Sequence, residues 1–149
     1  MRNALHAEVT GDGEITLTAH LVGSPEVAWD YLTSSEHLPK WLGHPVIFDL
    51  EVGGGIEVEV DSGDRFAGTF VAIDRPRSLV FTWGWRSGPV DIAPGATRVE
   101  MTLEPSGEGS ELQLVHRDLG EWAERNIVGW SLKFSRLIDL FPIADVDPR

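Results

Sequence analysis

The sequence contains a single long stretch with the apolar periodicity of a helix, and it lies near the C-terminal end. Its apolar residues recur at intervals of three and four positions: Ile127, Trp130, Phe134, Leu137, Ile138 and Phe141. This spacing predicts an amphipathic helix of about four turns that ends at Pro142. A sheet with one apolar face must be covered by another element. Any sheet formed by the rest of the chain therefore has only this helix as a large cover.

The residues before this helix predict strands for most of their length. Residues 14–21 alternate between apolar and polar side chains, as in a half-buried strand. Ser24 and Pro25 then provide a helix N-cap and first position, and a second short helix opens at Ser34 and ends near Trp41. From residue 46 to residue 115, alternating segments follow one another with short turns. This pattern predicts an antiparallel meander of about six strands.

The order of these segments predicts an α+β helix-grip fold, with residues 1–149 forming a single domain. In this fold a curved antiparallel sheet of about six to seven strands wraps around the long C-terminal helix, and two short helices follow the first strand. One helix cannot fill the concave side of such a sheet, so we expect a hydrophobic cavity between them. The segment from Ser87 to Gly95, rich in glycine and proline, is a candidate flap at its mouth.

Alternation and helical spacing indicate which side chains face this cavity. The candidates for ligand contact are Trp41, Phe70, Trp83, Trp85, Arg86, Met101, His116, Trp130 and Phe134. Tryptophan rings offer a large apolar contact area and one N–H for a polar ligand atom. The alternative is that these rings fill the core, above all at Trp130. Arg86 could clamp an anionic head group, whereas arginines more commonly form exposed ion pairs.

His116 has the inward parity of the strand that leads to the final helix. An imidazole at a cavity mouth could donate a hydrogen bond to a ligand carboxylate or act as a general acid or base. The alternative is a structural histidine whose ring nitrogens are both bonded. No nucleophile motif appears, so we assign no catalytic residue and keep His116 as the weak candidate.

Several classes of function are excluded or disfavoured by composition. The formal net charge is −12, and the only lysines are Lys40 and Lys133, so nucleic acid and anionic membranes are unsuitable partners. The chain has no cysteine, which excludes disulfides and zinc–thiolate sites. No signal peptide is visible and no apolar run is long enough to span a bilayer, so we expect a cytoplasmic protein.

We predict neither a metal site nor a cofactor. His37, His44 and Asp49 lie near one another in sequence, but they cross a helix end and a loop, and metal sites need ligands held at fixed geometry. The run from Gly53 to Gly55 precedes a strand rather than a helix. Phosphate-binding loops open a helix, so these glycines favour a bulge or a tight turn.

The chain resembles the family named for the activator of Hsp90 ATPase, within the START-like or Bet v 1-like superfamily. The resemblance rests on residues 29–33 with 41–42, 52–55, 68–70, 76–83, 114–116 and 129–130. It spans about residues 15 to 141 and implies the helix-grip fold. The superfamily includes lipid carriers, hormone receptors, polyketide cyclases and chaperone partners, so the resemblance does not select a function. The eukaryotic co-chaperones carry an additional N-terminal domain, for which this chain has no room.

Three hypotheses about function follow from the residues and the resemblance. The first is a binding module that holds a small apolar or amphipathic molecule between the sheet and the last helix. The second is a cyclase-, aromatase- or hydrolase-like enzyme that uses His116 with a neighbouring Arg or Asp. The third is a partner of an Hsp90-type chaperone that acts through its acidic outer surface. Homo-oligomer formation stays open, because nothing in the sequence predicts its geometry.

Overall fold

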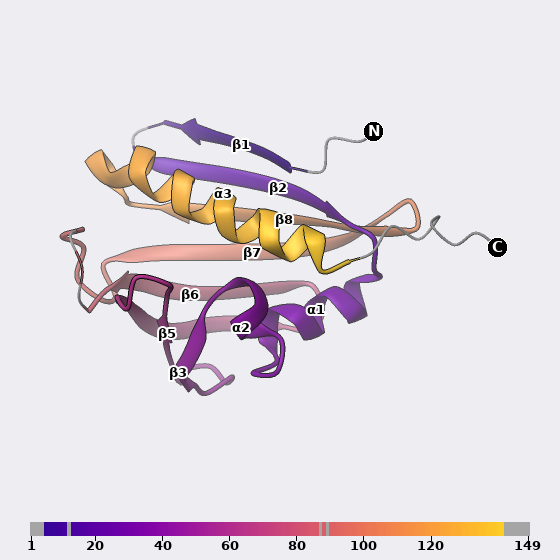
Figure 1. Cartoon of the computed structure of the whole chain (residues 1–149), viewed down its shortest axis with the longest axis horizontal. Helices are drawn as coiled ribbons and strands as arrows, with labels where there is room; N and C mark the ends of the chain where they lie inside the picture. Colours follow the sequence, from indigo (N-terminus) through magenta and orange to yellow (C-terminus); the bar gives the residue numbers. More distant parts are fainter. Residues whose placement is uncertain (1–4, 12, 87, 89, 142–149) are drawn as a thin grey trace.

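One antiparallel sheet and one long helix form the body of the molecule (Figure 1). The computed structural model describes residues 5–11, 13–86, 88 and 90–141. The strands are β1 (Leu5–Thr10), β2 (Glu14–Leu21), β3 (His44–Phe48), β4 (Gly55–Glu59), β5 (Arg65–Asp74), β6 (Ser78–Trp85), β7 (Thr97–Ser106) and β8 (Gly109–Arg117). The helices are α1 (Pro25–Thr33), α2 (Leu38–Trp41) and α3 (Ala123–Asp139), with a 3-10 turn at Gly120–Trp122.

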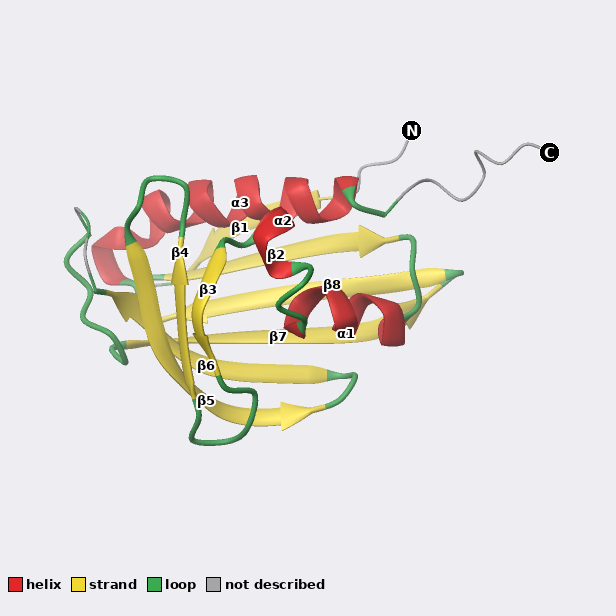
Figure 2. Cartoon of the chain, turned by 60° about the horizontal axis from the view of Figure 1, so that its bottom comes forward, coloured by secondary structure: helices red, strands yellow, loops and turns green. Residues whose placement is uncertain are grey.

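The sheet has eight strands in the order β1-β2-β8-β7-β6-β5-β4-β3. The connection from β2 to β3 passes through α1 and α2, while β3 to β8 form the predicted meander of six strands. Figure 2 shows β3 and β4 standing steeply against β6 to β8, so the sheet is strongly curved. The helix-grip architecture is therefore confirmed.

The strand count is higher than we expected, because β1 was missed. Its residues pair with β2 in register from Leu5↔Ala19 to Thr10↔Glu14. β1 is an edge strand whose side chains are half-buried or exposed, and its sequence alternates less clearly than that of β2. Only the pairing with β2 gives this segment its extended conformation, and pairing partners are not visible in local sequence.

The helix signals in the sequence are confirmed for α1. The Ser24 hydroxyl accepts a hydrogen bond from the Val27 backbone N–H at 3.3 Å, and Pro25 occupies the first turn. α3 begins at Ala123, four residues before the first apolar residue of the predicted stripe. Pro142, which we expected to stop this helix, lies outside the described residues.

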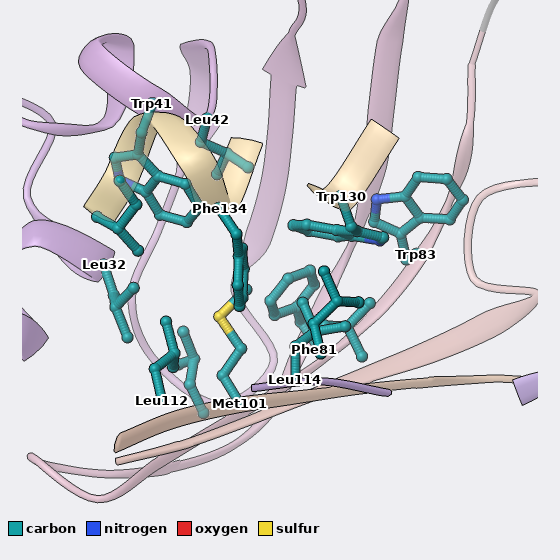
Figure 3. Packing of buried hydrophobic residues seen from close by; sticks show 14 of the residues in the cluster. Leu32, Trp41, Leu42, Phe81, Trp83, Met101, Leu112, Leu114, Trp130 and Phe134 are labelled. Atoms are coloured by element: carbon teal, nitrogen blue, oxygen red, sulfur yellow. The ribbon is translucent and has the colours of Figure 1, made fainter. Parts of the chain in front are cut away.

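The concave side of the sheet is packed with aromatic and aliphatic side chains from every layer (Figure 3). Phe134 of α3 lies between Trp41 and Met101 in this view, and Trp130 lies beside Trp83. Trp41 is 1% exposed, and its indole N–H donates to the Tyr31 carbonyl oxygen at 2.9 Å. Each such side chain contributes about 1.5–3 kcal/mol by leaving water. This filling is what limits the space left for a ligand.

The segment after β6 folds back onto the sheet. The backbone N–H of Trp85 donates to the Ile92 carbonyl oxygen at 2.7 Å, and Val90 and Ile92 are buried. Gly84 allows the segment around Ala93 to lie directly against β6, because the Ala93 carbonyl group occupies the place where a Cβ of residue 84 would stand. This is the segment that we named as a candidate flap, although Ser87 and Pro89 lie outside the described residues.

Candidate functional site

A small cavity lies between the first half of α3 and the ends of β5 and β6. Its walls are formed by Phe66, Trp83, Trp85, Asn126, Gly129, Trp130 and Lys133. Its volume of about 30 Å³ has room for one or two water molecules. The space that we expected between helix and sheet is thus present, but aromatic side chains fill most of it.

Two of the residues that line the cavity carry hydrogen-bond donors that have no acceptor. The indole N–H groups of Trp83 and Trp85 are buried without a hydrogen-bond partner. Trp83 is 2% exposed, and its nitrogen lies on the side of Trp130 in Figure 3. A buried donor without a partner costs about 1–3 kcal/mol. A bound acceptor would remove this free-energy cost for both N–H groups.

Lys133 adds a third donor to this cavity, from α3. Burial lowers the pKa of its ammonium group, the positive charge of Arg136 lowers it further, and Asp61 acts in the opposite direction. Asp61 itself accepts a hydrogen bond from Arg136 at 2.6 Å. Within the described part of the chain Lys133 forms no ion pair.

His116 is fully buried and does not line this cavity. Both of its ring nitrogens take part in a series of three hydrogen bonds. Trp130 Nε1 donates to His116 Nδ1 at 3.0 Å, so Nδ1 carries no proton and the proton sits on Nε2. Nε2 then donates to Thr97 Oγ1 at 2.8 Å, and the Thr97 hydroxyl donates to the Trp83 carbonyl oxygen at 2.7 Å. The Trp83 ring also packs against the imidazole in a T-shaped arrangement, with ring centroids 4.6 Å apart.

This chain of bonds fits only a neutral imidazole, because both ring nitrogens are already bonded in the Nε2–H tautomer. Burial lowers the pKa of His116 from 6.5 to about 3. Neither nitrogen is free to exchange a proton with a ligand. The geometry is therefore that of the structural histidine, the second of the two readings that the sequence left open.

The other predicted ligand contacts are divided between the cavity and the core. Trp83, Trp85 and Trp130 line the cavity. Trp41, Phe70, Met101 and Phe134 are buried in the core cluster and do not line it. Arg86 points elsewhere and donates to Glu57 at 2.8 Å, as the ion-pair alternative anticipated.

Four residues of the cavity were not among the predicted contacts: Phe66, Asn126, Gly129 and Lys133. Asn126 and Lys133 are seven positions apart with Trp130 between them, so they share one face of α3. The signal that could have found them is polar residues on the apolar face of an otherwise amphipathic helix. Asn126 Nδ2 donates to the Trp122 carbonyl oxygen at 2.9 Å, which holds this side chain beside the cavity.

A larger groove of about 630 Å³ lies at the other end of the sheet, beside the start of α1 and the β5–β6 turn. Its walls include the exposed charged residues Glu26, Asp74, Arg77 and Glu104. Volume alone would favour this groove. We place the candidate site at the smaller cavity because the unpartnered buried donors are there.

Two further features of the described residues bear on function. No group of three or more His, Cys, Asp or Glu side chains within them is arranged to hold a metal ion. Among these same residues, none of the helices has the length and apolar character needed to cross a membrane.

We expect Gly129→Ala to stabilise the protein by about 0.5–1 kcal/mol, because glycine inside a helix is less favourable than alanine by about that amount. A Cβ at this position would have no atom within 4 Å, so no clash opposes the gain. Urea unfolding of both proteins would measure it. A loss of stability would contradict the open space above Gly129.

Glu57 forms an ion-pair cluster on the outer face of β4. Its carboxylate is 8% exposed and contacts Arg86 at 2.8 Å and Arg65 at 3.4 Å. The hydrogen bond from Arg86 is the main cause that lowers the pKa of Glu57. The arginine side chains that cover it are themselves partly exposed, so solvent weakens the interaction.

We expect Glu57→Gln to destabilise the protein by about 1 kcal/mol at pH 7. Because the folded-state pKa is lowered, this contribution is present above pH 4.5 and is lost as the pH falls further. Urea unfolding at pH 7 and at pH 3.5 measures both effects. Glu59→Gln is the matched control, since Glu59 is 40% exposed and lies 3.4 Å from Arg65. Equal effects of the two substitutions would contradict this account.

Comparisons with known proteins agree with the architecture. A protein from Chromobacterium violaceum superposes with a TM-score of 0.76 at 23% identity, covering 88% of this chain and 99% of that one. An AHSA1 protein from Silicibacter pomeroyi has a TM-score of 0.69 at 26% identity, covering 85% and 96%. The Aha1 dimer from Colwellia psychrerythraea has a TM-score of 0.70 at 16% identity, covering 89% and 98%.

No curated protein matches the sequence significantly. The family model described as "Activator of Hsp90 ATPase homolog 1-like protein" matches residues 23–141, which is most of the chain. The match includes both short helices, strands β3 to β8 and the whole of α3, and so all the walls of the cavity. This chain belongs to the activator of Hsp90 ATPase homolog 1-like family.

Proposed function

We propose that this protein binds one small apolar or amphipathic molecule between α3 and the ends of β5 and β6. The observation that carries the proposal is the pair of buried indole N–H groups, on Trp83 and Trp85, that have no partner. Native proteins satisfy nearly all buried polar groups. A ligand that supplies an acceptor would complete this site.

A ligand requires the cavity to widen, because about 30 Å³ holds no more than a head group. Trp85, Gly129 and Lys133 are half-buried, so the cavity is close to the surface at these residues. Lys133 has a flexible side chain, and the half-buried Trp85 ring makes edge contacts with Phe66 and Trp83. Movement of these two side chains would open the cavity without disturbing the sheet.

Binding is favoured over catalysis by the state of His116. Both of its ring nitrogens are engaged, and it does not line the cavity. A general acid or base needs a nitrogen within reach of the substrate. The cavity therefore supports recognition better than proton transfer.

The test is the binding of ten-carbon amphipaths to the wild-type protein and to Gly129→Leu. We expect decanol or decanoate to bind with one-to-one stoichiometry in native mass spectrometry and calorimetry. The Gly129→Leu side chain would enter the open space above the helix and lower the affinity at least about tenfold. Gly129→Ala controls for the change in helix propensity. Failure of every amphipath to bind, or equal binding by Gly129→Leu, would overturn the proposal.

A further inference from the structure

Donor groups outnumber acceptors among the side chains that line the cavity, where Asn126 Oδ1 is the one side-chain acceptor. This imbalance says more about the ligand than the cavity volume does. Three of the residues that line it carry donor groups: Trp83 and Trp85, whose buried indole N–H groups have no partner, and Lys133 with its ammonium group. The amide N–H₂ of Asn126 is already bonded to the Trp122 carbonyl oxygen. Donors without acceptors recognise an acceptor, and an ammonium group among them favours a negative one.

We propose that the cavity selects ligands with a carboxylate head group, which would accept hydrogen bonds from the Trp83 and Trp85 indoles and pair with Lys133. This inference rests on the proposed binding function and specifies the chemistry of its ligand. Indole N–H groups donate only, so they cannot be satisfied by an ammonium head group. The charge of Lys133 would oppose such a ligand directly.

The size of the cavity agrees with a head group rather than a whole ligand. A volume of about 30 Å³ is close to that of a few atoms. The head group of the ligand would therefore fill the cavity, and its tail would extend out of it. Gly129 is the place on α3 where a tail could pass, since nothing lies within 4 Å of the position of a Cβ there. Leu132, three positions later and 53% exposed, lies beside this path on the helix surface.

Neighbouring charges do not supply the missing acceptor. Asp61 is the carboxylate whose charge acts on Lys133, but it is engaged with Arg136 at 2.6 Å. Burial and the charge of Arg136 together lower the pKa of Lys133 by more than the charge of Asp61 raises it. A bound carboxylate would place a negative charge beside Lys133 and raise its pKa again.

The experiment compares three probes with the same ten-carbon tail: decanoate, decanol and decylamine. We expect decanoate to bind about tenfold more tightly than decanol, and decylamine to bind most weakly. Lys133→Met keeps the length of the side chain and removes its charge. It should lower the affinity for decanoate about tenfold and change the affinity for decanol less than about threefold.

Two further variants sharpen the test. Lys40→Met is the matched control, because Lys40 is the only other lysine and is exposed on α2, and it should leave all three affinities unchanged. Trp85→Phe keeps an aromatic ring but removes one donor. It should lower the affinity for decanoate more than the affinity for decylamine. Circular dichroism checks that each variant folds.

The outcomes separate this inference from the proposed function. Equal affinities for decanoate and decanol in the wild-type protein would overturn the carboxylate preference and leave the binding function standing. An equal loss for both probes in Lys133→Met would do the same, since it would show a role in shape rather than charge. Binding of none of the three probes would overturn both.

Discussion

Acidification below about pH 6 is expected to destabilise the protein by roughly 1.4 kcal/mol per pH unit through His116 alone. The pKa of this buried imidazole is lowered from 6.5 to about 3 in the folded protein. Between these two values the unfolded chain binds a proton and the folded protein does not. Stability from this group is therefore complete above pH 6.5 and is lost progressively as the pH falls toward 3.

Urea unfolding at pH 7, 6 and 5 measures this effect, and His116→Gln isolates it from the carboxylates that also titrate in acid. The variant should be less stable at pH 7, because Trp130 and Thr97 lose a well-placed partner. Its stability should also fall less steeply with pH than that of the wild type. His20→Gln, at an exposed position of β2, is the control for the substitution. Parallel pH dependences of wild type and His116→Gln would show that His116 is not held neutral.

Gly84→Ala is expected to destabilise the protein by about 3 kcal/mol or more, among the largest effects of any single methyl group. Its Cβ would collide with the backbone of Ala93 and Pro94, which cannot move aside as a side chain can. The residues from 90 to 96 would have to leave β6, and the hydrogen bond from Trp85 to Ile92 would break.

Thermal and urea unfolding would measure the loss, with Gly129→Ala as a control of the same chemistry and opposite expected sign. The two substitutions each add one methyl group, so their difference reports the surroundings of each glycine together with its place in a helix or a strand. A loss below about 1 kcal/mol for Gly84→Ala would show that the segment after β6 is not held against the strand. Displacement of that segment would also free Trp85 at the cavity.

The fold could be predicted from the sequence because its signals are local and agree with one another. Alternation placed the strand at Glu14–Leu21, and Ser24 and Pro25 placed the start of α1. β1 could not be placed in this way, because its conformation depends on the pairing with β2. The start of α3 was set four residues late, since Ala123, which extends the buried face by one turn, is small and is followed by the charged Glu124 and Arg125.

The site was harder to predict. The alternation of residues along a strand tells which face of the sheet a side chain points to, but not how much space remains beside it. Trp83 was expected to face a cavity and Trp130 to face a cavity or fill the core; both line the small cavity and belong to the core cluster. The volume that remains depends on how they pack against Phe66 and on one another, which is a tertiary property. The state of His116 likewise depends on Thr97 and Trp130, which lie 19 and 14 positions away.

Membership of the family does not decide between the hypotheses about function. The chaperone-partner hypothesis and the enzyme hypothesis stay predictions beside the binding function proposed here. The first is tested by stimulation of an Hsp90-type ATPase. The engagement of both nitrogens of His116 removes the main support of the second.

The pairing of β2 with β8 has a consequence for how the chain reaches its native state. Ile15 lies opposite His116, so β2 finds this neighbour only when all the strands between them have been synthesised. Contacts so distant in sequence slow folding, because a long loop must close before they form. Until α3 arrives, the concave face carries Leu17, Phe81 and Trp83 uncovered. We therefore expect this sheet to complete its folding only once α3 has been synthesised, with the growing chain exposed to aggregation until that helix docks.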